Sequence, residues 1–234
     1  MTRGTGFAGD CSPALPGSLT FASMADENAH IYEPAQGHGL RHDPFNAIVG
    51  PRPIGWISSI SAKGEVNLAP YSFFNAFNYV PPLIGFSSMG RKDTVTNAEA
   101  MGEFTWNLAT RALANQMNLT STPAPPQIDE FDVAALTRAP SRLVKPPRVL
   151  ESPVNFECKV SQIIQLQGAN GVKADSWLVL GEVVAVHIDK GLIVDGIYQT
   201  AMAHPILRAG RAGDYFEISR DTAFEMRRPG WPID

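Results

Sequence analysis

The sequence predicts an all-β protein with a few short helices, folded as an antiparallel barrel. Six or more segments show the alternation or the apolar content of strands, and their spacing is that of hairpins. The helical segments between them are short, which argues against a parallel βαβ sheet. The chain has 234 residues, of which 44% are hydrophobic and 18% charged. A globular chain of this length buries enough surface to fold without a disulfide or a structural metal.

Charge and cysteine content exclude several classes of protein. The 19 Lys and Arg residues and 23 Asp and Glu residues give a net charge of −4, so we expect no nucleic-acid partner. Cys11 and Cys158 lie far apart, which is no disulfide framework and favours a cytoplasmic location. The longest apolar run, Trp177–Val186, is too short to span a bilayer and contains Glu182, so no membrane segment is expected.

The chain is predicted to form one domain after a flexible tail. Residues 1–23 are rich in Gly, Ser, Thr and Pro and cannot bury enough apolar surface to offset their ordering entropy. Residues 24–234 form the domain. The segment Gly4–Gly9 matches the dinucleotide pattern G-x-G-x-x-G, but no strand precedes it and no helix follows. We therefore interpret the match as a coincidence of a glycine-rich tail.

The first predicted elements are two strands of a hairpin. In Ile54–Ile60 both alternating sets of residues are uncharged, which indicates a strand covered on both faces. Ala62–Glu65 then supplies a polar turn that contains glycine, and Val66–Tyr71 is the returning strand.

Strands and short helices are predicted to alternate through the middle of the chain. Pro81 and Pro82 disfavour helix before the next apolar run, and Asp93 can cap a helix. The expected elements are a strand at Leu83–Ser88, a helix at about Thr94–Glu103, a strand at Phe104–Leu108 and a short helix at about Arg111–Leu119.

The C-terminal half is predicted to begin with a long loop. Seven prolines in residues 122–153 indicate a wrapping loop with at most a helical turn near Asp132–Leu136. The residues of Val154–Val160 alternate between apolar and polar, which predicts a half-exposed antiparallel strand, and a phase slip at Gln162–Ile164 indicates a bulge. Further strands are expected at Trp177–Ile188 and Asp214–Ser219.

A cluster of hydroxyl and cationic side chains precedes the predicted helix at residue 94. Ser87–Thr94 combines hydroxyls, two cations and the positive end of a helix, which together suit a phosphate group. Arg91 offers a planar fork and Lys92 a point charge. The alternative is a solvated turn in which Asp93 caps the helix, and the residues alone leave both interpretations open.

Four other residues could carry chemistry but have simpler explanations. His38 and His42 are spaced like metal ligands, but a nearby glycine and proline disfavour a helix there, so no metal site is predicted. Cys158 lies in the apolar row of its strand and is predicted to be a core residue. His204 could meet a substrate or could be a structural histidine with its own partner.

Several short motifs follow one another in a particular order and spacing. They are Arg52-Pro53-Ile54-Gly55-Trp56-Ile57-Ser58-Ser59, Asn67-Leu68-Ala69-Pro70-Tyr71-Ser72-Phe73-Phe74-Asn75, Pro81-Pro82-Leu83, Arg91-Lys92-Asp93-Thr94 with Asn97, Gly102-Glu103-Phe104 with Asn107-Leu108, Asp129-Glu130-Phe131, Glu157-Cys158 and Gly181-Glu182-Val183. Each motif is weak, but their combination is specific. The chain resembles the flavin reductase-like FMN-binding split-barrel family over residues 44–219.

The resemblance implies a six-stranded antiparallel Greek-key split barrel that forms a homodimer and binds FMN near the subunit interface. Ser58 and Ser59 are then expected at the phosphate or ribityl chain, and the backbone of Ala69–Ser72 along the isoalloxazine edge. The complete cofactor-binding set implied is Ser58, Ser59, Asn67, Ala69, Pro70, Tyr71, Ser72, Ser87, Ser88, Arg91, Lys92 and Thr94.

The activity implied is that of an FMN-dependent oxidoreductase similar to NAD(P)H:flavin reductases. Hydride would pass from NADH or NADPH to the flavin, and electrons would go on to an acceptor such as free flavin, a ferric chelate or an oxygenase partner. Ser72, Asn75 and His204 are the side chains expected to orient the reacting rings. Two alternatives are a flavoredoxin-like electron carrier and a flavin-binding split barrel without turnover.

The aromatic-rich segment Tyr71–Tyr79 also favours a homodimer. It carries more apolar surface than one small barrel interior readily covers, and large exposed apolar patches usually mark interfaces. The alternative is that these aromatic residues fill the barrel and pack under residues 122–153.

Overall fold

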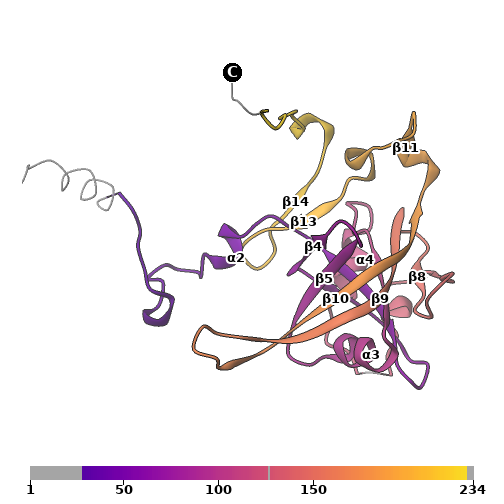
Figure 1. Cartoon of the computed structure of the whole chain (residues 1–234), viewed down its shortest axis with the longest axis horizontal. Coiled ribbons are helices and arrows are strands. Elements are labelled where there is room, and N and C mark those ends of the chain that lie inside the picture. The colour runs from indigo at the N-terminus through magenta and orange to yellow at the C-terminus, as the bar shows by residue number, and fades with distance from the viewer. Residues whose placement is uncertain (1–27, 126, 231–234) are drawn as a thin grey trace, which may run out of the picture. The chain divides into compact units, whose positions relative to one another are not determined.

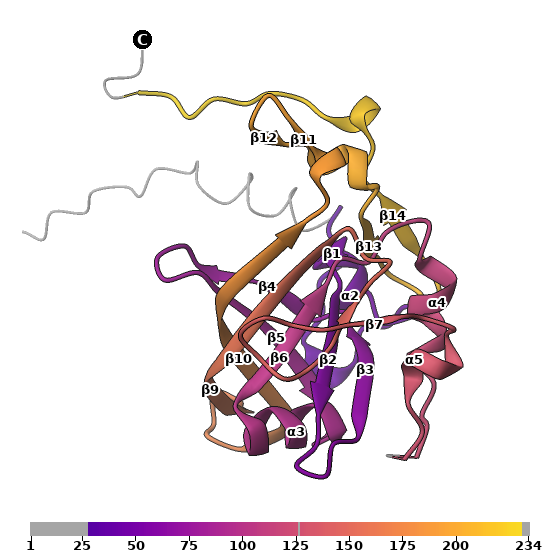
Figure 2. The same ribbon diagram turned by 90° about the vertical axis from the view of Figure 1, so that its right-hand side faces the viewer.

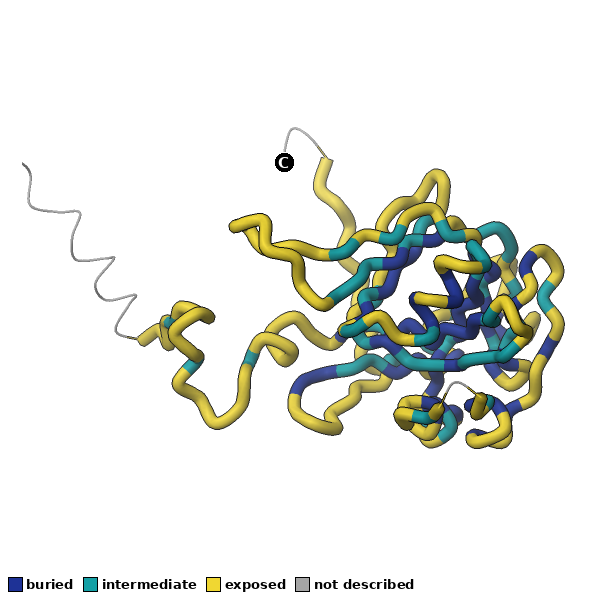
Figure 3. The backbone as a smooth tube through the Cα atoms, turned by 90° about the horizontal axis from the view of Figure 1, so that it is seen from below, coloured by how far each residue is buried: buried dark blue, intermediate teal, exposed yellow. Residues whose placement is uncertain are grey.

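The computed structural model describes residues 28–125 and 127–230, which belong to two compact units divided after Pro44. The predicted tail, residues 1–23, lies outside the described residues. Residues 28–44 of the first unit are largely exposed and contain one 3-10 turn, η1 (Pro34–Gln36) (Figure 3).

Two histidines of the first unit, His30 and His38, take part in local contacts. The Tyr32 ring contacts the rings of His30 and His38, at centroid distances of 5.8 and 6.3 Å. Nε2 of His30 hydrogen-bonds with the carbonyl oxygen of His38 at 2.7 Å, and Nδ1 of His38 accepts the N–H of Leu40 at 3.0 Å. In residues 28–125 and 127–230, no group of three or more His, Cys, Asp and Glu side chains is placed to hold a metal ion.

The second unit, Phe45–Asp234, is built on a seven-stranded antiparallel sheet that curls into a split barrel (Figures 1 and 2). The predicted fold class is confirmed, with one strand more than the six expected. In sheet order the strands are β3 (Val66–Tyr71), β2 (Gly55–Ile60), β6 (Glu103–Asn107), β9 (Val154–Gln167), β10 (Lys173–Ile188), β5 (Leu83–Met89) and β4 (Phe74–Asn78). The N–H of Ser87 donates to the carbonyl of Phe73 at 2.8 Å, which extends the pairing of β4 with β5.

Three small sheets and several short helices complete this unit. One sheet joins β1 (Arg52–Pro53), β13 (Ile206–Arg208) and β14 (Tyr215–Glu217); the others pair β7 (Arg138–Ala139) with β8 (Arg148–Val149) and β11 (Ile193–Val194) with β12 (Ile197–Tyr198). The helices are α2 (Phe45–Ile48), α3 (Asp93–Met101), α4 (Ala114–Leu119), α5 (Glu130–Val133), η2 (Lys190–Leu192), η3 (Thr200–Ala203) and η4 (Arg220–Thr222). No helix in the described part of the chain is long and apolar enough to cross a bilayer.

The β2–β3 hairpin forms as the sequence predicts. Gly64 takes a positive φ of 87° in the turn, a conformation that glycine adopts without strain. The hairpin places Ser59 opposite Asn67 and Ser58 opposite Leu68. Directly opposed residues in an antiparallel pair point to the same face of the sheet, and successive residues of one strand point to opposite faces. Ser58 and Ser59 therefore lie on opposite faces of the sheet.

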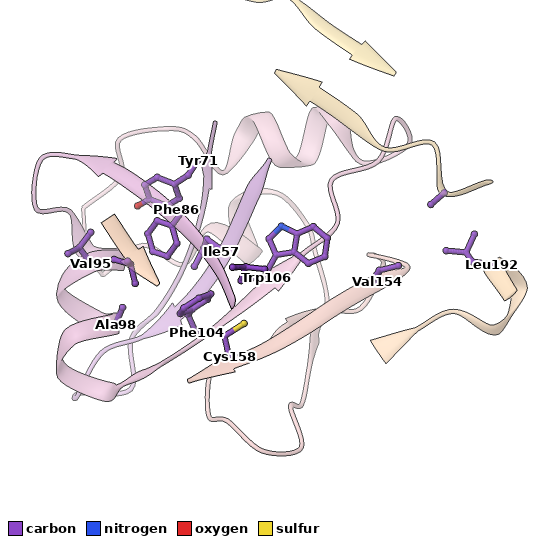
Figure 4. Close-up of a cluster of buried hydrophobic side chains, with 13 residues drawn as sticks. Ile57, Tyr71, Phe86, Val95, Ala98, Phe104, Trp106, Val154, Cys158 and Leu192 are labelled. Carbon is purple, nitrogen blue, oxygen red and sulfur yellow. The ribbon is translucent and has the colours of Figure 1, made fainter. Parts of the chain in front are cut away.

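The two faces of β2 contact two separate clusters of buried side chains. The barrel core lies inside the curled sheet, and Figure 4 shows its aromatic rings between the strands. The outer core lies between the other face of the sheet and the segment that carries α4 and α5. The barrel core includes Ile57, Tyr71, Phe86, Phe104 and Val179, and the outer core includes Trp56, Leu68, Met117, Phe131 and Val149.

Helix α3 packs its buried residues against the barrel core at one end of the sheet (Figures 2 and 4). It begins one residue before the prediction and ends two residues earlier, because Gly102 takes a positive φ of 69° and donates its N–H to Ala98. Val95 and Ala98 are fully buried. Asp93 lies in the first turn of the helix and Lys92 at its N-cap, so the predicted aspartate cap does not form.

Residues 122–153 cross the outer face of the sheet and contain α5, β7 and β8. Glu157 on β9 fastens this segment, since its buried carboxylate accepts the N–H groups of Arg142 at 2.7 Å and Leu143 at 2.6 Å. His187 hydrogen-bonds to the same carboxylate at 2.6 Å. The sequence predicted Glu157 on an exposed strand face; that prediction is wrong because the wrapping segment covers this part of β9.

The long hairpin β9–β10 has a register shift at Ser161, one residue before the bulge predicted at Gln162–Ile164. Gln162 pairs with Leu180 but Val160 pairs with Gly181, which leaves one extra residue on β9. A Cβ added at Gly181 would lie 2.4 Å from the Phe104 ring, so only glycine lets β10 approach that ring.

The aromatic segment 71–79 divides between the core and the surface. Tyr71 is buried in the barrel core, and Phe74 stacks on Trp106 at a centroid distance of 5.7 Å. Phe77 and Tyr79, at the end of edge strand β4, are 54% and 90% exposed. The first part of the segment therefore fills the barrel core, as the alternative interpretation expects, and its last part leaves apolar side chains exposed.

Candidate functional site

A cavity of about 440 Å³ runs along β3, one of the two edge strands of the main sheet. Its volume lies within the range of small-molecule sites. Three elements form its walls: β3, the N-terminus of α3, and the segment that follows α4. The lining residues are Asn67, Ala69, Pro70, Tyr71, Lys92, Asp93, Thr94, Thr120, Ser121, Thr122, Pro123, Ala124 and Glu130.

The outer edge of β3 presents backbone groups toward this side. The N–H of Leu68 donates to Oε2 of Glu130 at 2.9 Å, so the backbone of Leu68 faces away from β2. Backbone direction alternates along a strand, and Pro70 therefore also faces outward. Proline has no N–H, so an outward-facing Pro70 costs the pairing with β2 no hydrogen bond. The carbonyl oxygen of Pro70 is directed away from β2.

The N-terminus of α3 forms the cationic end of the cavity. Lys92 at the N-cap makes no side-chain cap hydrogen bond, and its carbonyl oxygen accepts the N–H groups of Val95 and Thr96. The N–H groups of Asp93 and Thr94 have no acceptor within the helix. An open helix N-terminus beside a lysine is a suitable site for an anion.

Hydrogen bonds between hydroxyl and amide groups hold α3 against β3. Nδ2 of Asn67 donates to Oγ1 of Thr94 at 2.8 Å. The Tyr71 hydroxyl is buried and hydrogen-bonds with Thr94 and Ser88. Burial raises the pKa of Tyr71 and outweighs these two hydrogen bonds, so the phenol stays neutral. These contacts fix the relative positions of the two walls.

Glu130 is a cavity residue that the sequence analysis did not single out. Its side chain is only 7% exposed, and burial raises its pKa above the usual value, against the N–H of Leu68 that stabilises the charged form. The only sequence signal for it is its place in the motif Asp129-Glu130-Phe131. Residues 120–124 were also missed, because a proline-rich loop has no periodicity that would place it over a strand edge.

Six of the predicted cofactor-binding residues lie together in this cavity, and the others do not line it. Ser59 accepts Nδ2 of Asn97 at 3.2 Å inside the barrel, whereas Ser58 faces the outer core and its buried Oγ has no partner among the described residues. Ser87 hydrogen-bonds to Ser176 at 3.1 Å. The six are Asn67, Ala69, Pro70, Tyr71, Lys92 and Thr94.

Arg91 and Lys92 differ in their surroundings although they are neighbours in the chain. Lys92 lines the cavity. Arg91 forms an ion pair with Glu99 on the exposed face of α3, and it does not line the cavity.

The three predicted orienting residues lie outside the cavity along β3. The carbonyl of Ser72 accepts Nε–H of Arg52 at 2.9 Å. Asn75 lines a separate, largely apolar cavity of about 280 Å³. His204 lines a third, of about 520 Å³, where its Nδ1 hydrogen-bonds to Oε1 of Glu217 at 2.6 Å.

The curled antiparallel sheet defines a split-barrel protein, whose cavity lies along one free edge of the sheet beside the N-terminus of α3. The sequence model of the flavin reductase like domain matches residues 50–205, about two thirds of the chain. The chain belongs to this family.

Proteins similar to this chain include uncharacterised ones from several microorganisms. A protein of Halalkalibacterium halodurans is 34% identical over 201 residues, which cover 80% of this chain and 95% of that protein. A protein of Aquifex aeolicus is 35% identical over 155 residues, covering 64% and 76%.

Solved structures of the same fold include oxidoreductase components. Nitrilotriacetate monooxygenase component B from Bacillus cereus is 27% identical with a TM-score of 0.73, covering 92% of this chain and 100% of that one. The 2-nitrobenzoate 2-nitroreductase NbaA of Pseudomonas fluorescens is 25% identical with a TM-score of 0.75, covering 88% and 99%. Flavoredoxin of Desulfovibrio vulgaris, at 20% identity and a TM-score of 0.64 over 78% and 92%, shares the fold.

The residues along β3 suit the separate parts of a phosphorylated flavin, and the same cavity also contains the carboxyl groups of Asp93 and Glu130. An open helix end and Lys92 suit the phosphate, and the hydroxyls of Ser121 and Thr122 and the amide of Asn67 suit a polyol chain. The outward backbone of β3 offers hydrogen-bonding groups for the edge of a planar ring.

Proposed function

We propose that this protein is an FMN-dependent oxidoreductase that accepts a hydride from NADH or NADPH and delivers the electrons to a further acceptor. The observation that carries the proposal is the cavity along β3, which joins an anion site at the N-terminus of α3 to the backbone edge of a strand. Membership of the flavin reductase like family and the similarity to monooxygenase component B support it.

In this proposal each wall of the cavity binds one part of the cofactor. Lys92 and the N–H groups of Asp93 and Thr94 hold the phosphate. Asn67 and the hydroxyls of the segment after α4 bind the ribityl chain, and the Ala69–Tyr71 backbone lies along the ring. Bound FMN supplies the hydride acceptor and the route for electrons to leave. The protein positions the rings and needs no side-chain nucleophile.

Ser59 and Ser88 have supporting rather than contacting roles in this proposal. Ser58, Ser87 and Arg91 do not line the cavity and are assigned no contact with the cofactor. Ser88 hydrogen-bonds to Tyr71 and so helps to hold the wall formed by β3, and Ser59 fixes α3 through Asn97. Ser72, Asn75 and His204 remain candidates for orienting the rings. Asn75 uses Oδ1 to accept the N–H of Ala76 at 2.8 Å, which leaves its amide N–H groups as donors.

The proposal includes a homodimer with an oxygenase or another protein as electron acceptor, in the cytoplasm. Exposed apolar residues at the end of β4 support the dimer: Phe77, Tyr79 and Val80 are 54%, 90% and 79% exposed. The similarity to a monooxygenase component supports the oxygenase partner. The buried, unpaired thiol of Cys158 is consistent with a reducing compartment.

A flavoredoxin-like electron carrier is the second candidate, because flavoredoxin shares the fold. The two are separated by mixing the FMN-loaded protein anaerobically with NADH or NADPH and following the flavin absorbance. Rapid bleaching by either nucleotide is expected. A flavin that binds but is bleached only by a protein donor would favour the carrier, and a protein that binds no flavin would contradict both.

A further inference from the structure

The cavity along β3 contains a buried carboxylate for which the proposed function gives no role. Glu130 lines the cavity with a side chain that is only 7% exposed. Its Oε2 accepts the outward N–H of Leu68 at 2.9 Å, which ties α5 to the edge of the sheet. A buried carboxylate in a ligand cavity affects the charge that the ligand meets.

The charges around this cavity do not match a phosphate group when all of them are ionised. The cavity is lined by one cation, Lys92, and two carboxylates, Asp93 and Glu130, so its formal charge is then −1. The segment 120–124 adds hydroxyls but no charge. The titratable and charged groups around Glu130 are Lys92 and Asp93 at the start of α3, Tyr71 from β3, and Asp129 at the N-cap of α5. The carboxylate of Asp129 is paired with Arg138 of β7.

A proton on Glu130 would remove this mismatch. Burial raises the pKa of Glu130, and the nearby charges of Asp129 and Asp93 raise it further. A bound phosphate would add negative charge beside the same group and favour its neutral form. A neutral carboxyl group can also donate a hydrogen bond, which an ionised one cannot.

We propose that Glu130 takes up one proton from solvent when a phosphorylated flavin binds, so that the affinity for FMN rises as the pH falls. This inference rests on the proposed function and concerns the same cavity. Riboflavin has no phosphate, so its affinity should depend much less on the protonation of Glu130. Through Glu130, the preference for FMN over riboflavin should therefore increase as the pH falls.

The test compares the full-length protein with Glu130→Gln and Asp132→Asn. Glutamine keeps an oxygen for the N–H of Leu68 but has no charge, and Asp132 is a carboxylate of the same helix that does not line the cavity. FMN and riboflavin affinities are measured by flavin fluorescence at about pH 5.5 and about pH 8, on either side of the phosphate's second ionisation. That ionisation is common to all three proteins and cancels when they are compared.

We expect the ratio of FMN affinities at the two pH values to be about tenfold larger for wild type than for Glu130→Gln, since one pKa unit corresponds to a factor of ten. Asp132→Asn should behave as wild type, and the riboflavin ratios should agree among all three. Equal FMN ratios for wild type and Glu130→Gln would overturn the inference and leave the proposed function standing. Wild-type protein that binds neither flavin would overturn both.

Calorimetry of the wild type gives an independent test that requires no variant. FMN binding measured near neutral pH in two buffers of different ionisation enthalpy should show net proton uptake. Net proton release would mean that only the phosphate changes its ionisation beside Lys92, and it would overturn the inference.

Discussion

Replacing Lys92 by alanine should weaken FMN binding about tenfold and leave riboflavin binding nearly unchanged, because Lys92 is the only cation that lines the cavity among the described residues. The matched control is its neighbour Arg91. Its guanidinium is paired with Glu99 and does not line the cavity, so Arg91→Ala should have little effect on either flavin.

The expected magnitude follows from the surroundings of the two cations. A charge-assisted contact to phosphate contributes about 1.5–3 kcal/mol when it is partly desolvated. Lys92 is exposed, so solvent screens its charge and the lower limit applies, which corresponds to about tenfold in affinity. The Arg91 and Glu99 side chains are 42% and 53% exposed, and such surface pairs contribute about 0–1 kcal/mol.

Flavin fluorescence titration of FMN and riboflavin against the wild type and both variants measures these effects, at low and at high salt. The loss for Lys92→Ala should shrink as salt rises. Equal weakening of FMN binding by Arg91→Ala and Lys92→Ala would refute the assignment of Lys92 to the phosphate. A fall in riboflavin binding parallel to that of FMN binding would refute it as well.

Three further predictions concern stability and assembly. Burial raises the pKa of Glu157, but the N–H of Arg142, His187 and the N–H of Leu143 outweigh it and hold that pKa below its usual value. The ionised Glu157 carboxylate therefore stabilises the folded protein fully above the usual glutamate pKa. This stabilisation is lost as the pH falls through the lower pKa that Glu157 has in the folded protein. In urea unfolding, Glu157→Gln should lose about 2–4 kcal/mol at neutral pH, and a loss that stays constant under acid conditions would contradict this. Gly181→Ala should lose about 1–3 kcal/mol or more by its clash with the Phe104 ring; an unchanged thermal midpoint would show that β10 can shift. Sedimentation of the FMN-loaded protein should give twice the mass of one chain, and an active monomer at assay dilution would refute the dimer.

Local signals in the sequence were sufficient for most strands of the main sheet and for part of the cavity lining. The hairpin of β2 and β3 follows from uncharged alternation on both sides of a glycine turn, and β3 has the predicted bounds. Lys92 and Thr94 could be predicted because a helix N-terminus and the residues beside it are adjacent in the chain. These residues are neighbours in the chain, so their proximity does not depend on contacts between distant segments.

Only the tertiary structure decides which residues share the cavity and which are turned away from it. Glu130 joins it through a hydrogen bond to Leu68, 62 residues away in the chain, which no local pattern encodes. Glu157 is buried because residues 122–153 cover its strand, although the alternation of that strand predicts exposure. Strand alternation places Ser58 and Ser59 in different cores, but whether either core opens to a ligand depends on what packs over it. The sequence by itself therefore determined most strands of the main sheet, the fold class and the residues at the N-terminus of α3. Packing between distant segments decided that Glu130 and the segment after α4 form the other walls of the cavity. Burial and charge environment depend on contacts between distant residues, and the periodicity of a local sequence does not predict such contacts.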